Sequence, residues 1–404
     1  MDIDRLHALA EKYTESSARF LRDIIAIPST SCNEEKVVER IGDEMEKVGF
    51  DEIIIDPMGN ILGRIGNGKH IIAMDGHIDT VDVGNINNWK HDPFKGKMEN
   101  GIIYGRGASD MKGAMAAMVY AGKLIKDLSL EDDYTLYITG TVQEEDCDGL
   151  CWQYIIREDG IVPEVVVIAE PTDLQIYRGQ RGRLELEVVT EGISAHGASP
   201  ELGVNAIYKL APIILDIENL NTQLKTDEFL GKGTITISRV SSGAPSLNAV
   251  ADMAALYIDR RMTVGETLKS VKEEIESLPS FQNAGAKIII PEYDVPGYKG
   301  LRYKMDKYYP TWILDEGHPV LNAATDVFEK VYHKKAVTGK WGFSTNGVST
   351  AGLFNIPTFG FGPANEIHAH TVDDQCPVWH LTEAMKFYAA FPKHYVQTVR
   401  GNNL

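Results

Sequence analysis

The run HIIAMDGHID, residues 70–79, joins an apolar stretch directly to a histidine and an aspartate. Residues 70–75 form a short and almost continuously apolar run, which predicts a buried strand. In the extended segment that follows, alternate side chains share one face, so His77 and Asp79 can stand beside each other. The run therefore predicts a strand with a polar pair at its carboxyl end.

Apolar runs and helical patterns alternate on both sides of this strand. The expected helices are 4–25, 34–48 and 113–125, and the further expected strands are 134–142 and 164–169. Such an alternation predicts an α/β fold, with a mixed, mainly parallel sheet flanked by helices.

The pattern changes near Tyr177, and the earlier type of segment returns after about Glu292. Between them the order is strand, helix, strand, strand, helix, strand, which predicts a ferredoxin-like α+β layer. The expected strands are 183–189, 234–240, 249–258 and 286–290, and the expected helices are 204–219 and 266–278. A chain of 404 residues is too long for one ordinary core. We therefore predict a catalytic domain in two parts, 1–177 and 294–404, with an inserted domain at 178–293.

Composition narrows the class of protein. The formal net charge of −18 disfavours binding to nucleic acid or to anionic membranes. No apolar run is long enough to cross a bilayer, and residues 1–5 lack the basic and apolar regions of a signal peptide. Four cysteines do not make a disulfide framework and are expected to be reduced thiols. These features predict a cytoplasmic protein.

Acidic residues follow two further predicted strands. Glu144 and Glu145 come directly after one strand, and Glu170 comes after another. Because ligands of open α/β sheets bind beyond the carboxyl ends of the strands, we expect these acids to converge with His77. Adjacent side chains point in different directions, so one acid of the pair can bind a metal while the other faces water.

Asp110 and a late histidine complete a possible metal site. Asp110 precedes strong helix formers, so it can cap a helix and can also offer its two oxygens to two metals. His370 and His368 lie in one polar loop, and either could be a ligand on chemistry alone. Two histidines, one bridging acid and two terminal acids are a full ligand set for a pair of divalent ions. Asp79 is the natural acid to orient His77, since ligating histidines usually donate their second N–H to a carboxylate.

Together, these segments resemble the dinuclear zinc superfamily of aminoacylases, acetylornithine deacetylases, succinyl-diaminopimelate desuccinylases and glutamate carboxypeptidases, over roughly residues 15–390. Within this superfamily, the sequence is most similar to a bacterial branch of peptidases and deacylases. The resemblance implies a cis peptide bond after Asp110 and selects His370 over His368. Asp374 stands where the family usually has Glu. The implied roles are metal ligation by His77, Asp110, Glu145, Glu170 and His370, orientation of His77 by Asp79, and general base catalysis by Glu144.

The inserted segment also resembles the family, through Ser194-Ala195-His196-Gly197-Ala198 and Leu247-Asn248-Ala249-Val250. The resemblance implies that His196 reaches the active site of a partner subunit and steadies an oxyanion, which requires a homodimer through the inserted domain. Asn248 and Arg261 match positions that hold the free carboxylate of the substrate, although Arg260 could act instead of Arg261.

The sequence thus predicts a metal-dependent hydrolase that cleaves the amide bond of an N-acyl amino acid or small peptide. Two Zn²⁺ per subunit suit the mixed nitrogen and oxygen ligands, and Co²⁺ or Mn²⁺ could substitute. Water is activated between the two ions, with Glu144 as the base. One alternative is a ureidohydrolase acting on an N-carbamoyl amine. The other is a non-catalytic dimeric binding protein that kept the fold.

Overall fold

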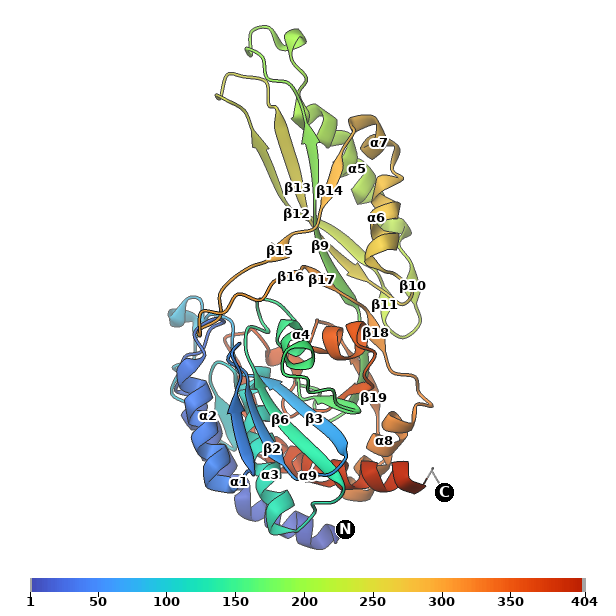
Figure 1. Ribbon diagram of the computed structural model, residues 1–404. Helices are drawn as coiled ribbons and strands as arrows, with labels where there is room; N and C mark the ends of the chain where they lie inside the picture. Colours follow the sequence, from blue (N-terminus) through green and yellow to red (C-terminus); the bar gives the residue numbers. More distant parts are fainter. Residues whose placement is uncertain (1, 402–404) are drawn as a thin grey trace.

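The structure is a computed structural model that describes residues 2–401. It contains a nine-stranded and a five-stranded sheet, and each sheet has its own hydrophobic core. Figure 1 shows the larger sheet and its helices in the lower half and the smaller sheet in the upper half, with the long strand β9 leading from one to the other. The predicted α/β architecture with a mixed, helix-flanked sheet is confirmed.

The nine-stranded sheet is parallel at its centre and mostly antiparallel toward its edges, although β19 runs parallel to β8. The strand order is β1-β2-β6-β3-β7-β20-β8-β18, with β19 also paired to β8. Strand β3 runs parallel to both β6 and β7, and almost every residue of β3 is buried, which explains its apolar sequence. The strands are β1 Glu52–Ile55, β2 Ile61–Ile65, β3 His70–His77, β6 Tyr134–Thr141, β7 Val165–Ile168, β8 Ile176–Gln180, β18 Trp312–Ile313, β19 Thr338–Trp341 and β20 Thr358–Gly360.

Helices flank this sheet. The helices α3 and α9 pack against each other, and α1 packs against both. The three helices predicted for this part of the chain are present, each within two residues of its expected ends. Gly49 ends α2 in the left-handed conformation (φ 95°) that glycine adopts without strain. The helices are α1 Ile3–Ile25, α2 Glu35–Val48, α3 Gly113–Asp127, α4 Leu150–Arg157, α8 Pro319–Tyr332 and α9 Val378–Gly401.

The second sheet has the element order and strand order of a ferredoxin-like layer, β12-β13-β9-β14, and all its neighbouring pairs are antiparallel. The short strand β17, Tyr308–Tyr309, also pairs with β9. Its other elements are β9 Gly182–Glu191, α5 Ala206–Gln223, β12 Thr234–Gly243, β13 Met253–Met262, α6 Leu268–Glu276, α7 Pro279–Ala284 and β14 Lys287–Ile289.

Of the four strands of this layer, β13 differs most from its predicted bounds. We expected 249–258, whereas β13 begins at Met253. The residues before it bond to a loop instead of to β12: Val250 N–H donates to the Ala195 carbonyl, and Ala206 N–H donates to the Ala251 carbonyl. Apolar side chains in this segment therefore pack under a loop and not in a sheet.

The predicted domain boundary at residue 177 falls inside strand β8, which belongs to the larger sheet. The chain enters the second sheet only at Gly182. The segment 294–404 also reaches the second sheet, through β17. The division into 1–177, 178–293 and 294–404 stays a prediction, and residues 1 and 402–404 lie outside the described part.

Short strands complete the fold. They form a three-stranded sheet and two hairpins: β4 Lys97–Glu99, β5 Ile102–Tyr104 and β21 Gln375–Pro377; β10 Thr226–Asp227 and β11 Gly231–Lys232; β15 Glu292–Tyr293 and β16 Met305–Asp306. All four cysteines are free thiols. Among residues 2–401, no helix is both long enough and apolar enough to span a bilayer.

The buried His380 of helix α9 makes folding stability depend on pH. Its Nδ1 accepts a hydrogen bond from Ala364 N–H (3.0 Å), and its nearest acid, Asp173, is 3.9 Å from Nε2. Burial lowers the pKa of His380 to about 4, against a weaker opposing effect of Asp173. Below pH ~6.5 the unfolded chain therefore binds a proton that the folded chain refuses, so stability falls as pH drops toward 4.

We expect the unfolding free energy of the wild type to drop by about 2 kcal/mol more than that of His380→Gln between neutral pH and about pH 4.5. Urea unfolding of both proteins at the two pH values measures this difference. Equal losses in both proteins would show that His380 does not carry the effect.

Candidate metal centre

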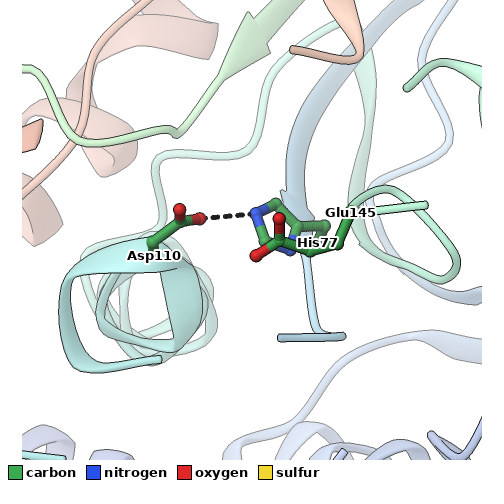
Figure 2. Close-up of side chains that lie close together, drawn as sticks. All are labelled: His77, Asp110 and Glu145. Carbon is green, nitrogen blue, oxygen red and sulfur yellow. Dashed lines mark hydrogen bonds and ion pairs between the residues drawn. The ribbon is translucent and has the colours of Figure 1, made fainter. Parts of the chain in front are cut away.

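Three strand ends bring the predicted residues together. His77 is the last residue of β3, Glu144 and Glu145 follow β6, and Glu170 follows β7. These strands are neighbours in the sheet and run parallel, so their carboxyl ends meet at one edge. Figure 2 shows His77, Asp110 and Glu145 pointing toward one another from a strand end, a helix start and a loop.

Asp110 lies at the middle of a row of five side chains. Its Oδ1 is 2.7 Å from His77 Nε2, and its Oδ2 is 3.2 Å from His370 Nε2. On one side, His77 Nε2 is 3.4 Å from Glu170 Oε1. On the other side, His370 Nε2 is 2.9 Å from Glu145 Oε2. The two halves of the row share only Asp110, which is the arrangement expected of a bridging acid.

The local backbone explains how Asp110 is presented. It lies in the irregular turn Ala108–Lys112 before α3, with non-helical angles (φ −125°, ψ 97°). The peptide bond from Asp110 to Met111 is cis, as the resemblance implied. The interpretation of Asp110 as a helix cap is wrong, because Lys112 occupies the N-cap position of α3 and the Asp110 carboxylate contacts both histidines.

Charge is concentrated in this buried place. Burial and neighbouring carboxylates raise the pKa of Glu170 to about 8, and they raise the pKa of Glu144 well above its usual range. Although burial opposes them, hydrogen bonds with His370 and His77 hold the pKa of Asp110 below its ordinary value. Asp110 and Glu145 in turn raise the pKa of His370 to about 10. The buried carboxylates thus repel one another, and positive charge placed among them stabilises their ionised forms.

The residues fit a pair of divalent cations. Three buried carboxylate oxygens of this centre have no hydrogen-bond partner among the described residues: Glu144 Oε1, Glu145 Oε1 and Glu170 Oε2. Ligand atoms also gather in two overlapping groups, and within each group all atoms lie within 4.8 Å of one another. One group is His77, Asp110 and Glu145, and the other is His77, Glu144 and Glu170. Buried, unpaired carboxylates are costly unless they are paired or coordinate metals. Imidazole and carboxylate donors suit zinc and similar ions.

Asp79 acts differently from the prediction. His77 Nδ1 is 2.9 Å from the main-chain oxygen of Asp79 and 3.6 Å from its carboxylate. The carboxylate instead accepts hydrogen bonds from Glu144 N–H (3.2 Å), Glu145 N–H (3.1 Å) and the Ser31 hydroxyl (2.6 Å). Asp79 therefore orients His77 through its backbone and fixes the Glu144–Glu145 loop through its side chain.

We expect Asp79→Asn to lower kcat by about 10- to 100-fold, the usual effect of losing an outer partner in a metal site. An amide can turn only one acceptor oxygen toward the two backbone N–H groups, so the loop that carries Glu144 would shift. Steady-state kinetics measures the effect, and Asp82→Asn, an exposed acid of the same segment, is the matched control. Wild-type kcat in Asp79→Asn would refute this role.

Asp374, the departure from the usual family residue, has a clear structural task. The fully buried carboxylate accepts hydrogen bonds from Gly107 N–H and Ser109 N–H, both at 2.8 Å, and pairs with Arg106 at 3.1 Å. Burial raises the pKa of Asp374 to about 7. Asp374 therefore holds the turn that presents Asp110.

A cavity of about 370 Å³ opens onto the centre. Arg261 lines it, whereas Arg260 is completely buried and pairs with Glu266 and Glu274. Successive side chains of a strand point to opposite faces, so only Arg261 can face the cavity. The full lining is Asp110, Glu144, Glu145, Asp148, Glu170, Arg183, Arg261, Phe343, Ser344, Glu366, Ala369 and His370. Sequence reasoning missed Asp148, Arg183 and Glu366. The alternation along β9 puts Arg183 on one face of that strand, but it does not say that this face meets the cavity.

His196 and Asn248 do not line this cavity. Both are exposed and lie next to each other, since Gly197 N–H donates to the Asn248 carbonyl (2.7 Å). Their segments lie at the end of the second sheet that is remote from the larger sheet (Figure 1). Within one chain, the structure therefore does not bring these two predicted residues to the metal centre.

Residues 73–394 match the profile of Peptidase family M20/M25/M40. The relative named "Uncharacterized protein YgeY" of Escherichia coli is 52% identical over 389 residues, which are 96% of each chain. A relative from Staphylococcus epidermidis named "Probable succinyl-diaminopimelate desuccinylase" is 25% identical over 384 residues, covering 89% of this chain and 93% of the relative.

Several solved structures have a similar fold. Aminopeptidase PepT from Bacillus cereus has a TM-score of 0.71 at 19% identity and covers 95% of this chain and 99% of its own. The YXEP protein of Bacillus subtilis, described as a dinuclear metal binding peptidase, has a TM-score of 0.69 at 16% identity, with 96% and 99% coverage. At these identities the likeness shows the fold alone. The matched profile covers most of the chain and shows that it belongs to Peptidase family M20/M25/M40; with the desuccinylase relative, it makes the protein a metal-dependent hydrolase of amide bonds.

Proposed function

We propose that the protein is a dinuclear zinc amidohydrolase that removes an acyl or aminoacyl group from the amine of an amino acid. The observation that carries this proposal is the row Glu170, His77, Asp110, His370, Glu145, with Asp110 shared between its halves. His77, Asp110 and Glu170 would hold one ion, and Asp110, Glu145 and His370 the other. When bound, the ions supply a Lewis acid for the carbonyl oxygen and make a bound water more acidic.

Glu144 is the proposed general base. It is buried and lines the cavity, its Oε1 has no hydrogen-bond partner among the described residues, and its Oε2 is 4.0 Å from His77 Nε2. Two backbone bonds to Asp79 fix the loop that carries it. Glu144 takes a proton from the attacking water and passes it to the nitrogen of the leaving amine.

Arg261 is the proposed anchor for the free carboxylate of the substrate. Its guanidinium lines the cavity and is held by Asp259 through two bonds of 2.8 and 3.1 Å. A planar fork of N–H donors matches a carboxylate. This anchor would place the amide carbonyl at a fixed distance from the metal ions.

A homodimer through the second sheet would supply the missing residues. His196 and Asn248 are exposed at the remote end of that sheet, where they could enter the cavity of a partner. Large apolar side chains are exposed on the same loops and on α5, which is unusual for a free surface: Leu202 (75%), Tyr208 (76%), Leu215 (64%) and Leu247 (110%). His196 would then donate a hydrogen bond to the developing oxyanion.

The free thiols fit a reducing, cytoplasmic location.

This arrangement predicts complementation between two inactive variants. We expect His196→Ala and Glu144→Gln each to lose most activity, while a mixed dimer keeps one site with an intact Glu144 and the partner's intact His196. Co-expressed, differently tagged chains mixed equally should recover about a quarter of the wild-type sites, since half of the dimers are mixed and half of their sites are complete. No recovery in purified mixed dimers would contradict a shared site.

Hydrolysis assays with zinc-loaded protein test the proposed function. The panel contains N-acetyl amino acids, dipeptides and N-carbamoyl amino acids. Turnover of either of the first two classes supports the proposal. Turnover of N-carbamoyl substrates alone would identify a ureidohydrolase. No turnover of any class would overturn the proposal that the protein hydrolyses small amides.

A further inference from the structure

Two arginines face each other at the wall of the cavity. Arg183 of β9 and Arg261 of β13 are paired positions of neighbouring antiparallel strands, and both line the cavity. Directly opposed side chains of such strands lie about 5 Å apart at Cβ, and like charges there are destabilising. Acidic side chains stand beside each of them, Asp148 and Glu185 beside Arg183 and Asp259 beside Arg261. A carboxylate of a ligand placed between the two guanidiniums would further reduce their repulsion.

Arg183 is held rigidly and has unused donor capacity. Its side chain is 18% exposed, and its guanidinium lies 4.2 Å from the ring centroid of Tyr309. Its contacts with Asp148 (3.4 Å) and, through Nε, with Glu185 (3.7 Å) are long, and the buried Nε makes no hydrogen bond among the described residues. Stacking on the ring leaves the edge of the guanidinium available for a planar carboxylate. A buried, unmade hydrogen bond is costly, so a ligand that makes it gains affinity.

All but one of the acidic side chains that line the cavity already have a role or a partner. Asp110, Glu145 and Glu170 belong to the metal centre, Glu144 is the base, and Asp148 accompanies Arg183. Glu366 is the one lining acid left, and its Oε2 has no described partner. Both guanidiniums keep ion pairs with acids, yet each also lines the cavity, where it can meet an anionic group of a substrate.

We propose that Arg183 is a specificity-determining residue that binds a second anionic group of the substrate. The preferred substrates are then N-acyl or aminoacyl amino acids with two carboxylates, one for Arg261 and one for Arg183. This inference rests on the proposed function, since it names the substrate class of the same cavity. The second carboxylate can belong to the amino acid side chain or to the acyl group.

Matched substrate pairs test the inference and distinguish the two sources. N-Acetylglutamate with N-acetylglutamine tests the side chain, and N-succinylalanine with N-butyrylalanine tests the acyl group; N-acetyllysine is the cationic comparison. We expect kcat/KM to favour the dianionic member of at least one pair by about 10- to 100-fold, the effect of one charge-assisted hydrogen bond. In Arg183→Gln this preference should disappear, because the dianionic member of the pair loses the charge-assisted contact that the neutral member never makes.

Controls separate charge from folding. Arg19→Gln removes one exposed positive charge of helix α1 and should keep the preference. Arg183→Lys keeps the charge but loses the planar fork, so it should keep part of the preference; it also serves if Arg183→Gln does not fold. No preference in the wild type, a preference for the neutral or lysine substrate, or a preference that survives Arg183→Gln would overturn the proposal.

A binding measurement decides the inference even if no amide in the panel is cleaved. Calorimetric titration of wild type and Arg183→Gln with glutarate and with butyrate compares a dianion and a monoanion. We expect glutarate to bind at least about tenfold more tightly than butyrate to the wild type only. That result without turnover would contradict the proposed function and uphold the role of Arg183, whereas turnover without this discrimination would do the reverse.

Discussion

Replacing Glu144 with glutamine is expected to lower kcat by about 10²- to 10⁴-fold, the usual contribution of a positioned general base. Glutamine has nearly the same size and can keep the buried position, but it cannot accept the proton of the attacking water. KM and metal content should change little, because Glu144 lies outside the proposed ligand set. Steady-state kinetics and metal analysis of the same preparation measure both quantities.

The control for this variant lies on the same loop. Asp146 is exposed and contacts the Tyr293 hydroxyl at 3.2 Å, outside the cavity. Asp146→Asn should therefore keep near wild-type kcat. A Glu144→Gln enzyme with wild-type kcat would remove Glu144 from the reaction, and a loss of bound metal in that variant would instead make it a ligand.

Replacing Asp110 with asparagine is expected to remove at least one metal ion per subunit and to lower kcat/KM by about 10³-fold or more. The side chain contacts both histidines, so it is the one place where a single change affects both halves of the centre. An amide is neutral and offers one oxygen instead of two, so it cannot bridge two cations. Atomic absorption and kinetics on the same sample measure the loss.

Asp373→Asn is the matched control, since this exposed acid lies three residues from His370 on the same loop. It should retain two ions per subunit. Two tightly bound ions in Asp110→Asn would contradict the bridging role.

Much of the metal centre could be predicted because its residues follow local patterns. His77, Glu145 and Glu170 come directly after apolar strands, and parallel strands bring their carboxyl ends to one edge without further information. Asp110 and His370 depend on loops, and only the resemblance to a family selected His370 over His368. The structure places all five in one row.

Other features required three-dimensional contacts. The two roles of Asp79, and the bonds of Asp374 to the turn before α3, depend on backbone groups far away in sequence. Arg183 faces the centre only because the second sheet sits over the cavity, which no local pattern of β9 specifies. Which of Arg260 and Arg261 faces the cavity was predictable in principle, because the register of β13 decides which side chain lies on that face of the sheet.

The late start of β13 has a similar cause. Residues 249–251 carry the apolar pattern of a strand, yet their backbone bonds go to the loop around residues 195–206. Apolar composition predicts burial, whereas strand pairing depends on which backbone groups lie opposite. The same loop carries His196, so its position at the remote end of the sheet could not be derived from the strand pattern.

The most direct test of the two-metal centre is anomalous diffraction at the zinc edge from crystals of the zinc-loaded protein. Two peaks are expected, one among His77, Asp110 and Glu170 and the other among Asp110, Glu145 and His370, with Asp110 between them. A single peak, or peaks away from Asp110, would contradict the proposed centre.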